Sequence, residues 1–211
     1  MIRILIADDH AIVRRGMKQL LLEHYPFARI GEASNVEELI SEIINQEEEW
    51  DVVVCDMNMP GRSGLDAIMQ IREIAPGLPV LIMSMYPEDQ YALRVLKSGA
   101  AGYLTKETIH DDIVRAIETV IKGKRYITLS LAEKLAESVN SESAKALHEE
   151  LSDREFDVFK LLASGKTISE IAIQLSLSST TVSTYRSRIM EKMKMKSNAE
   201  LARYAIEARL I

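Results

Sequence analysis

The sequence predicts an α/β domain built on a doubly wound parallel sheet of five strands, followed by a small all-α domain of four helices with a helix-turn-helix. Strand and helix patterns alternate five times over residues 1–122, with short connections between them. The apolar run VVVC at residues 52–55 is typical of a strand buried on both faces at the centre of a parallel sheet. Residues 151–211 show only helical periodicity, in a stretch too short for a second sheet.

The first domain is expected to contain five strands and five helices in alternation. Strands are predicted at residues 3–7, 27–33, 52–55, 79–84 and 101–104. Helices are predicted at residues 10–25, from 34 onward, and at 65–74, 88–97 and 111–122. Ser34 and Glu37 have the spacing of a capping box at the start of the second helix. Pro60-Gly61 and Pro76-Gly77 are turn signals that separate a strand from a helix and a helix from a strand.

The pattern changes after residue 122. Residues 138–145 are polar and small, which indicates a linker, with a short helix at 129–137 as one option. Ser152 and Glu155 have the spacing of a second capping box. Further helices are predicted at residues 153–164, 168–175, 179–193 and 198–207. The expected organisation is therefore a first domain at residues 1–122, a linker at 123–148 and a helical domain at 149–211.

Composition and charge restrict the class of protein. The chain has 211 residues, is 47% hydrophobic and has a single cysteine, Cys55, which fits a reducing cytoplasm. No apolar run approaches the roughly 18–20 residues that cross a membrane, and the start MIRILIADD does not resemble a signal peptide. Residues 1–122 hold 20 acidic and 12 basic side chains, whereas residues 180–196 hold five basic side chains and one acidic one. The two domains are therefore expected to bind different partners.

Polar side chains stand where four of the five strands end: Asp8-Asp9, Asp56, Ser84 and Thr105-Lys106. These ends meet at one edge of a doubly wound sheet, so three carboxylates and one lysine should converge there. Clustered carboxylates repel one another unless a cation lies among them, and hard oxygen ligands suit Mg²⁺. Asp56 is a candidate nucleophile, because carboxylates form acyl phosphates, and Lys106 could neutralise the charge of a phosphoryl group.

Each of these residues also has a simpler interpretation. Asp8-Asp9 could cap the following helix, and Asp56 could cap a turn. Lys106 could be solvated, Ser84 could bond the backbone, and Tyr103 could serve only in packing. What favours a site is that these residues occur together at the ends of the correct strands.

Residues 1–122 resemble the receiver domain of two-component response regulators, which has a flavodoxin-like fold. The residues that carry the resemblance are Asp8-Asp9, Asp56, Met59-Pro60-Gly61, Gly64, Ser84, Tyr103 and Lys106. The resemblance implies that Asp56 accepts a phosphoryl group from a phosphohistidine. It implies that Mg²⁺ is held by Asp8 or Asp9, by Asp56 and by the backbone carbonyl of Asn58. It also implies that Ser84 and Lys106 contact the phosphoryl oxygens and that Tyr103 is the switch aromatic residue.

The helical region contains a helix-turn-helix pattern at residues 168–193. Polar side chains on the early turns of its second helix could reach base edges, and the later basic ones could reach phosphates. The simpler alternative is an exposed, solvated helix in a small bundle. The candidate contact residues are Thr181, Ser183, Thr184, Tyr185, Arg186, Ser187, Arg188 and Lys192. Val182, Ile189 and Met193 are expected in the core instead.

Residues 151–205 resemble the LuxR/NarL-type helix-turn-helix domain, in the motifs Leu151-Ser152, Arg154-Glu155, Gly165, residues 168–172, and Thr181-Val182-Ser183-Thr184-Tyr185. The resemblance implies that residues 180–192 enter the major groove. This chain has Ser183 and Ser187 where several members carry lysine. A larger share of the contacts is therefore expected from Thr184, Arg186 and Arg188.

Together the two domains predict a NarL/FixJ-type response regulator of the cytoplasm. Its expected partners are a sensor histidine kinase or phosphotransfer protein and double-stranded DNA, and it is expected to form a homodimer when phosphorylated and to bind no membrane. It is not expected to be an enzyme, apart from catalysing its own phosphorylation and dephosphorylation. One alternative is a transcription factor that works without phosphorylation. The other is an aspartyl-phosphate hydrolase, which usually needs a second acid two residues after its nucleophile, where this chain has Asn58.

Overall fold

The computed structural model describes residues 1–45, 49–59, 62–133, 147–208 and 210–211. The chain divides into two compact units, Met1–Asn140 and Ser141–Ile211, and each is described by itself. The first unit contains the predicted α/β fold, and the second contains the predicted helical fold.

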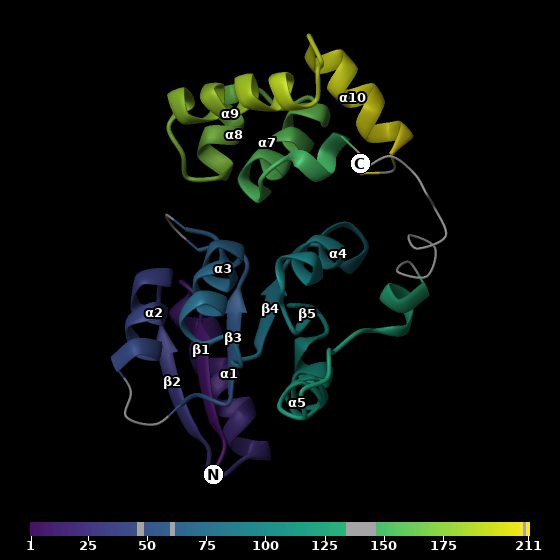
Figure 1. Cartoon of the computed structure of the whole chain (residues 1–211). Coiled ribbons are helices and arrows are strands. Elements are labelled where there is room, and N and C mark those ends of the chain that lie inside the picture. Colours follow the sequence, from purple (N-terminus) through teal and green to yellow (C-terminus); the bar gives the residue numbers. More distant parts are fainter. Residues whose placement is uncertain (46–48, 60–61, 134–146, 209) are drawn as a thin grey trace. The chain divides into compact units, whose positions relative to one another are not determined.

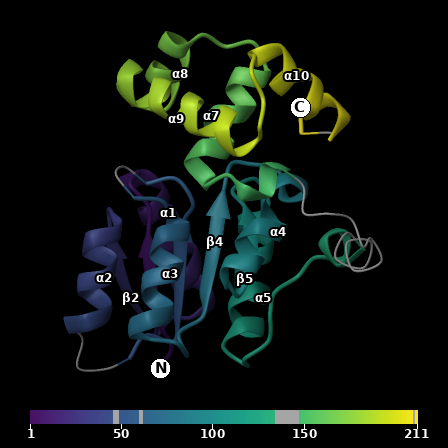
Figure 2. The ribbon, with the colours of Figure 1, turned by 45° about the horizontal axis from the view of Figure 1, so that its top comes forward.

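Five parallel strands form the sheet of the first unit. They are β1 (Arg3–Ala7), β2 (Arg29–Ala33), β3 (Val52–Asp56), β4 (Val80–Ser84) and β5 (Gly102–Thr105), in the spatial order β2-β1-β3-β4-β5. In Figure 2 the arrow of β4 can be followed between α3 and α4. The switch in strand order lies between β1 and β3, where open α/β sheets place their ligands.

Helices cover both faces of this sheet (Figure 1). They are α1 (Ala11–His24), α2 (Val36–Asn45), α3 (Gly64–Ile74), α4 (Glu88–Ser98) and α5 (Ile109–Val120). Side chains of α1 and α5, including Met17, Leu21 and Ile117, pack on alternate strand residues such as Ile4, Val54 and Met83. Helices α2, α3 and α4 follow one another over the opposite face. This two-sided cover explains why β3 and β4 are buried along their whole length.

The strand register brings the carboxyl ends of the strands together. Cys55 lies opposite Ala7 on β1, Asp56 lies opposite Met83 on β4, and Ser84 lies opposite Thr105 on β5. The chain therefore carries the residues that follow Ala7, Cys55 and Thr105 to one edge of the sheet, as the sequence predicts.

One predicted cap was wrong. Helix α2 begins at Val36, and its cap is made by Asn35, whose side-chain oxygen accepts a hydrogen bond from the Glu38 backbone at 2.8 Å. The Glu38 carboxylate in turn accepts from the backbone N–H of Ser34 at 2.7 Å. The capping pair is thus shifted by one residue from the predicted Ser34–Glu37, because Asn is as good an N-cap as Ser and the helix starts one residue later. The predicted turn at Pro60-Gly61 lies outside the described residues.

The second unit is a bundle of short helices. They are α7 (Asp153–Ala163), α8 (Ile168–Gln174), α9 (Ser179–Lys192) and α10 (Asn198–Glu207), preceded by a 3₁₀ turn at Leu147–Glu150. The predicted capping box of Ser152 and Glu155 is present at the start of α7. Buried Phe156, Phe159, Val182 and Ile189 form part of the core. All four predicted helices of this region are therefore confirmed within a residue at each end.

The turn between α8 and α9 is short. Its Ser176 has φ 54°, in the left-handed region, and the Leu177 N–H bonds the Ala172 carbonyl at 2.8 Å. Ser178 then caps α9 by accepting from the Thr181 backbone at 3.0 Å. Helix α9 therefore follows α8 directly, as a helix-turn-helix requires.

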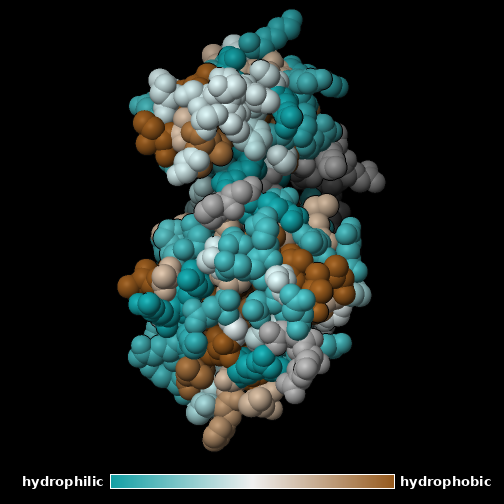
Figure 3. Space-filling view, turned by 90° about the vertical axis from the view of Figure 1, so that its left-hand side faces the viewer, coloured by the Kyte–Doolittle hydropathy of each residue, from teal (hydrophilic) through white to brown (hydrophobic). Residues whose placement is uncertain are grey.

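Figure 3 shows one face of the molecule, where hydrophobic side chains form small patches among hydrophilic ones. The most exposed large apolar side chains of the first unit come from different elements, for example Ile12 of α1, Ile44 of α2 and Met69 of α3. Scattered exposure of this kind is ordinary for a globular protein.

Candidate functional site

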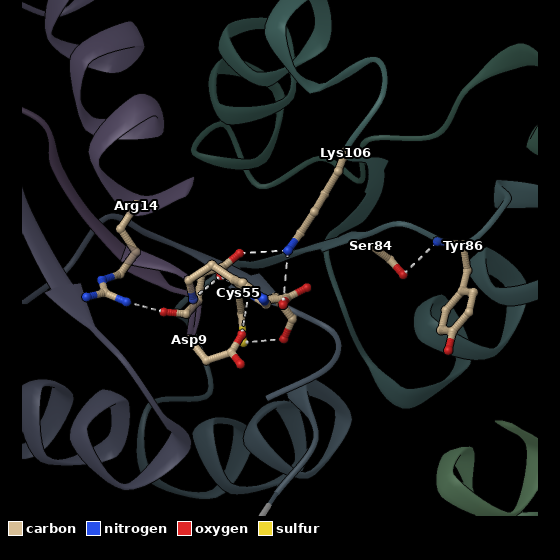
Figure 4. A network of polar contacts seen from close by, with 9 residues as sticks. Asp9, Arg14, Cys55, Ser84, Tyr86 and Lys106 are labelled. Carbon is tan, nitrogen blue, oxygen red and sulfur yellow. Dashed lines mark hydrogen bonds and ion pairs between the residues drawn. The ribbon is translucent and has the colours of Figure 1, made fainter. Parts of the chain in front are cut away.

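A buried carboxylate stands at the end of the central strand. Asp56 is the last residue of β3 and is 3% exposed, and Asp8, directly after β1, is fully buried. The ammonium of Lys106, which follows β5, donates to Asp8 Oδ2 at 2.7 Å and lies 3.0 Å from Asp56 Oδ2. Figure 4 shows the Lys106 side chain extended toward the cluster, with dashed lines marking these two contacts. Three strand ends therefore supply one compact ionic cluster, in the positions that the sequence predicts.

Burial is the main influence on the Asp56 carboxyl group. The net pKa of Asp56 is raised to about 6: burial raises it most, the nearby Lys106 lowers it, and the negative charge of Asp8 raises it. Burial also lowers the pKa of the Lys106 ammonium, but its hydrogen bond to Asp8 and its attraction to Asp56 outweigh that effect, so the net pKa is raised. Lys106 therefore stays charged and is the cation that compensates the buried acids.

The acidic pair Asp8-Asp9 and the following histidine complete a group of possible metal ligands. One ligand atom from each of Asp8, Asp9, His10 and Asp56 lies within 4.8 Å of all the others. The His10 backbone N–H donates to Asp8 Oδ1 at 2.7 Å, and its ring Nδ1 lies 2.7 Å from Asp9 Oδ1. Three carboxylates at this spacing fit a hard divalent cation.

His10 was not among the predicted site residues. Its backbone N–H and its ring both face the acidic pair. The only signal in the sequence is its position directly after that pair, at the point where the chain leaves the strand.

The backbone around Asp56 is also shaped for the site. The N–H of Asn58 donates a hydrogen bond to the Asp56 carboxylate, which lowers the pKa of that group. A Cβ atom on Gly64 would lie 2.5 Å from the Asp56 carbonyl oxygen, so only glycine fits there. Glycine is needed at residue 64 because the start of α3 lies very close to the backbone of Asp56.

Ser84 is the last residue of β4, and Tyr103 lies on the neighbouring strand β5. Ser84 is fully buried, and its hydroxyl oxygen accepts from the Tyr86 N–H at 3.1 Å (Figure 4). The Tyr103 hydroxyl donates to the Tyr86 carbonyl at 2.8 Å. Burial raises the pKa of Tyr103 well above the ordinary value. Both predicted switch residues therefore meet at Tyr86.

Helix α9 has a buried side and an exposed side. Val182, Ile189 and Met193 are buried, as predicted. Ser183, Thr184, Ser187 and Arg188 are exposed, whereas Thr181, Tyr185 and Arg186 are partly buried. The hydroxyls of Ser183, Thr184 and Ser187 each donate to a carbonyl one turn earlier, at 2.9, 3.0 and 3.2 Å. Arg188 is the basic side chain on the exposed side of the middle of this helix.

Two other basic candidates have partners within the unit. The Arg186 guanidinium donates to Asn198 Oδ1 at 3.0 Å, which ties α9 to the start of α10. Lys192 donates to Glu155 Oε2 at 2.5 Å, and that carboxylate is 3% exposed. Burial raises the pKa of Glu155, but the bonds from Lys192 and Ser152 lower it by more. Lys192 therefore pairs with a buried acid, which sequence periodicity could not reveal.

Family models match both units. Residues 4–118 match the response regulator receiver domain, and residues 149–205 match the bacterial regulatory proteins of the luxR family. The chain belongs to the response regulators. This response regulator is of the NarL/FixJ type, with a receiver and a LuxR-type DNA-binding domain, and its family consists of transcription regulators rather than enzymes.

Relatives match this response regulator over nearly its whole length. It is 34% identical over 207 residues to the response regulator GacA of Pseudomonas aeruginosa, covering 98% of this chain and 96% of the relative. It is 33% identical to the response regulator UvrY of Escherichia coli K12, over 98% of this chain and 94% of the relative. It is 34% identical to the oxygen regulatory protein NreC of Staphylococcus epidermidis, over 99% of each.

Solved structures show the same fold. RcsB from Salmonella enterica serovar Typhimurium, bound to the promoter rprA in the presence of phosphomimetic BeF₃⁻, matches with a TM-score of 0.61 and 26% identity, over 97% of this chain and 98% of RcsB. A structure of two RcsB dimers bound to two parallel DNAs matches with a TM-score of 0.58 and 26% identity, over 96% of this chain and 97% of the RcsB chain. Among the described residues of this response regulator, no helix is long and apolar enough to span a membrane.

Proposed function

We propose that Asp56 is the phosphoryl acceptor of this response regulator and that its phosphorylation controls DNA binding. A carboxylate oxygen of Asp56 attacks the phosphorus of a phosphohistidine on a sensor kinase or phosphotransfer protein. The P–O bond to Asp56 forms while the P–N bond breaks, and the histidine leaves. The observation that carries this proposal is the position of Asp56: a buried carboxylate at the end of the central strand, 3.0 Å from the Lys106 ammonium.

Lys106 and Ser84 are the proposed contacts of the phosphoryl oxygens. Lys106 is charged and already lies among the carboxylates, so it can neutralise part of the charge that arrives with the phosphoryl group. Ser84 would exchange its contact with the Tyr86 N–H for one with the phosphoryl group. Tyr103 would then repack, because its hydroxyl is held by the same loop.

Mg²⁺ is the proposed cofactor. Asp9, Asp56 and the backbone carbonyl of Asn58 would hold it, with Asp8 beside them, and His10 orients the acidic pair. When bound, the ion would neutralise phosphoryl charge and position the donor. In the same proposal the receiver catalyses its own phosphorylation and dephosphorylation and no other reaction.

Removing divalent cations should stop phosphorylation. We expect excess chelator to slow phosphate uptake from a small acyl-phosphate donor by roughly a hundredfold or more, because metal ions supply several kcal/mol of charge stabilisation. The rate of labelling, measured with and without chelator and after Mg²⁺ is restored, tests this. Undiminished labelling in chelator would refute the metal role.

The C-terminal domain is proposed to bind double-stranded DNA through α9. Its exposed hydroxyls would lie in the major groove, and Arg188 would contact a phosphate. A phosphorylated homodimer would place two such helices about one DNA turn apart, ~34 Å. The DNA complexes and dimers of RcsB support this arrangement. A protein that acts on DNA in this way would work in the cytoplasm.

A DNA-binding measurement decides between this proposal and a regulator that works without phosphorylation. We expect beryllofluoride with Mg²⁺ to shift the full chain towards a dimer and to tighten DNA binding by roughly tenfold, which is about 1.4 kcal/mol of coupling. Sedimentation and DNA titration, with and without beryllofluoride, measure both effects. Equal affinity in the two states would favour the phosphorylation-independent alternative. Multiple turnover of a phosphomonoester would favour the hydrolase.

A further inference from the structure

The chain that follows α5 returns to the sheet as a strap, which we define as residues 124–131. The Tyr126 N–H donates to the Ala101 carbonyl at 2.8 Å, and Tyr126 forms a parallel bridge with Gly102 of β5. The Tyr126 side chain is buried and belongs to the same core cluster as Leu104 of β5 and Ile117 of α5. The strap is therefore an added piece of the sheet edge and belongs structurally to the receiver.

The sheet and α5 hold the first half of the strap firmly. A Cβ atom on Gly102 would lie 2.9 Å from the Tyr126 Cβ and 2.8 Å from a methyl carbon of Leu81, so this position has room only for glycine. The Arg115 guanidinium of α5 donates to the Tyr126 hydroxyl at 3.0 Å and lies over its ring. Tyr126 is thus anchored from two sides.

The second half of the strap contacts a different element, α4. The Thr128 hydroxyl donates to Glu88 Oε1 at 2.6 Å, and Glu88 is the first residue of α4. The same hydroxyl oxygen accepts from the Leu131 N–H at 3.2 Å, where a helical turn at residues 129–133 begins. Leu131 is buried. Thr128 therefore joins α4 to the last described segment before residue 134.

Helix α4 begins directly after the loop that contains the switch contacts. Ser84 accepts from the Tyr86 N–H, and Tyr103 donates to the Tyr86 carbonyl, two residues before Glu88. If Ser84 turns to a phosphoryl group on Asp56, the Tyr86 N–H loses its acceptor and the start of α4 is displaced. Tyr126 remains fixed to the sheet edge. A displacement of α4 must then change the distance between Glu88 and Thr128, and so strain their hydrogen bond.

We propose that the Glu88–Thr128 hydrogen bond is a latch that phosphorylation of Asp56 opens. The closed latch holds the turn at residues 129–133 against the receiver, and the open latch releases it, so that the signal passes to the chain leading to the DNA-binding domain. This inference rests on the proposed function of Asp56. Coupling is reciprocal: if the phosphomimetic state opens the latch, then breaking the latch must favour that state.

Replacing Glu88 tests the reciprocity. In the full chain with Mg²⁺, E88A should bind beryllofluoride about fivefold more tightly, which is the size expected from one partly buried hydrogen bond. E88Q keeps an acceptor oxygen and should bind nearly as the wild type does. D89A is the matched control, because it removes an exposed acid from the same first turn of α4. Isothermal titration calorimetry gives the dissociation constants, and equal values for E88A and D89A would overturn the latch.

Hydrogen–deuterium exchange gives a second, local readout. Beryllofluoride should raise the exchange rate of the amides at residues 129–133 at least tenfold in the wild type. In E88A the exchange should be fast without beryllofluoride and change little with it. If peptides around Asp56 become protected while residues 129–133 do not change, the latch is wrong and the phosphorylation site stands. If the wild type does not bind beryllofluoride, both proposals fail.

Discussion

Replacing Asp56 with asparagine should abolish phosphate uptake from a small acyl-phosphate donor. Asparagine has nearly the same shape but no anionic oxygen to attack phosphorus, so the P–O bond cannot form. The change also removes one of the two carboxylates that hold the Lys106 ammonium. We expect labelling to fall by at least about a thousandfold, the scale of a lost nucleophile. Intact-chain mass spectrometry after incubation with the donor measures the outcome.

A second acid, directly before the same strand, provides the control. Asp51 lies next to the amino end of β3, and its carboxylate accepts from the Arg3 backbone at 2.7 Å. D51N removes the same charge from the opposite end of the strand and should be labelled as the wild type is. Stoichiometric labelling of D56N would contradict the proposed function. Loss of labelling in D51N would indicate misfolding instead.

The arrangement of Asp8, Asp56 and Lys106 could be predicted because it follows from backbone topology. Parallel strands joined by helices bring their carboxyl ends to one edge, whichever side chains they carry. Residues at the ends of three correctly predicted strands must therefore lie together. The burial of β3 was predictable for the same reason, since an interior strand of a parallel sheet is covered on both faces.

Contacts that depend on side-chain direction could not be predicted. His10 faces the acidic pair through its ring and its backbone N–H, but its identity alone indicates no such contact. Glu155 and Lys192 are 37 positions apart, and only the packing of α7 on α9 brings them together. The hydrogen bond between Glu88 and Thr128 has the same origin. The shifted cap at Asn35 shows that local signals can also compete, because Ser34 and Asn35 are both good caps.

The two basic side chains Arg188 and Lys192 should respond differently to substitution. Arg188 is exposed on α9, so R188A should weaken DNA binding by at least about tenfold without affecting folding, as expected for a lost phosphate contact. In a dimer that loses two such contacts, the slope of log K against log salt should fall by about two. DNA titrations at several salt concentrations measure both quantities.

Lys192 should matter for stability instead. K192M leaves the buried Glu155 carboxylate without its ammonium partner, which should lower the free energy of unfolding of the DNA-binding domain by about 1–3 kcal/mol. Chemical denaturation of the full chain measures this loss, and the salt dependence of DNA binding should stay that of the wild type.

R203A is the matched control for R188A, because Arg203 is an exposed arginine of α10 and not of α9. If R188A leaves the salt slope unchanged, the phosphate contacts lie elsewhere. If K192M reduces the salt slope and leaves the stability unchanged, then Lys192 contacts the DNA in the complex and not Glu155.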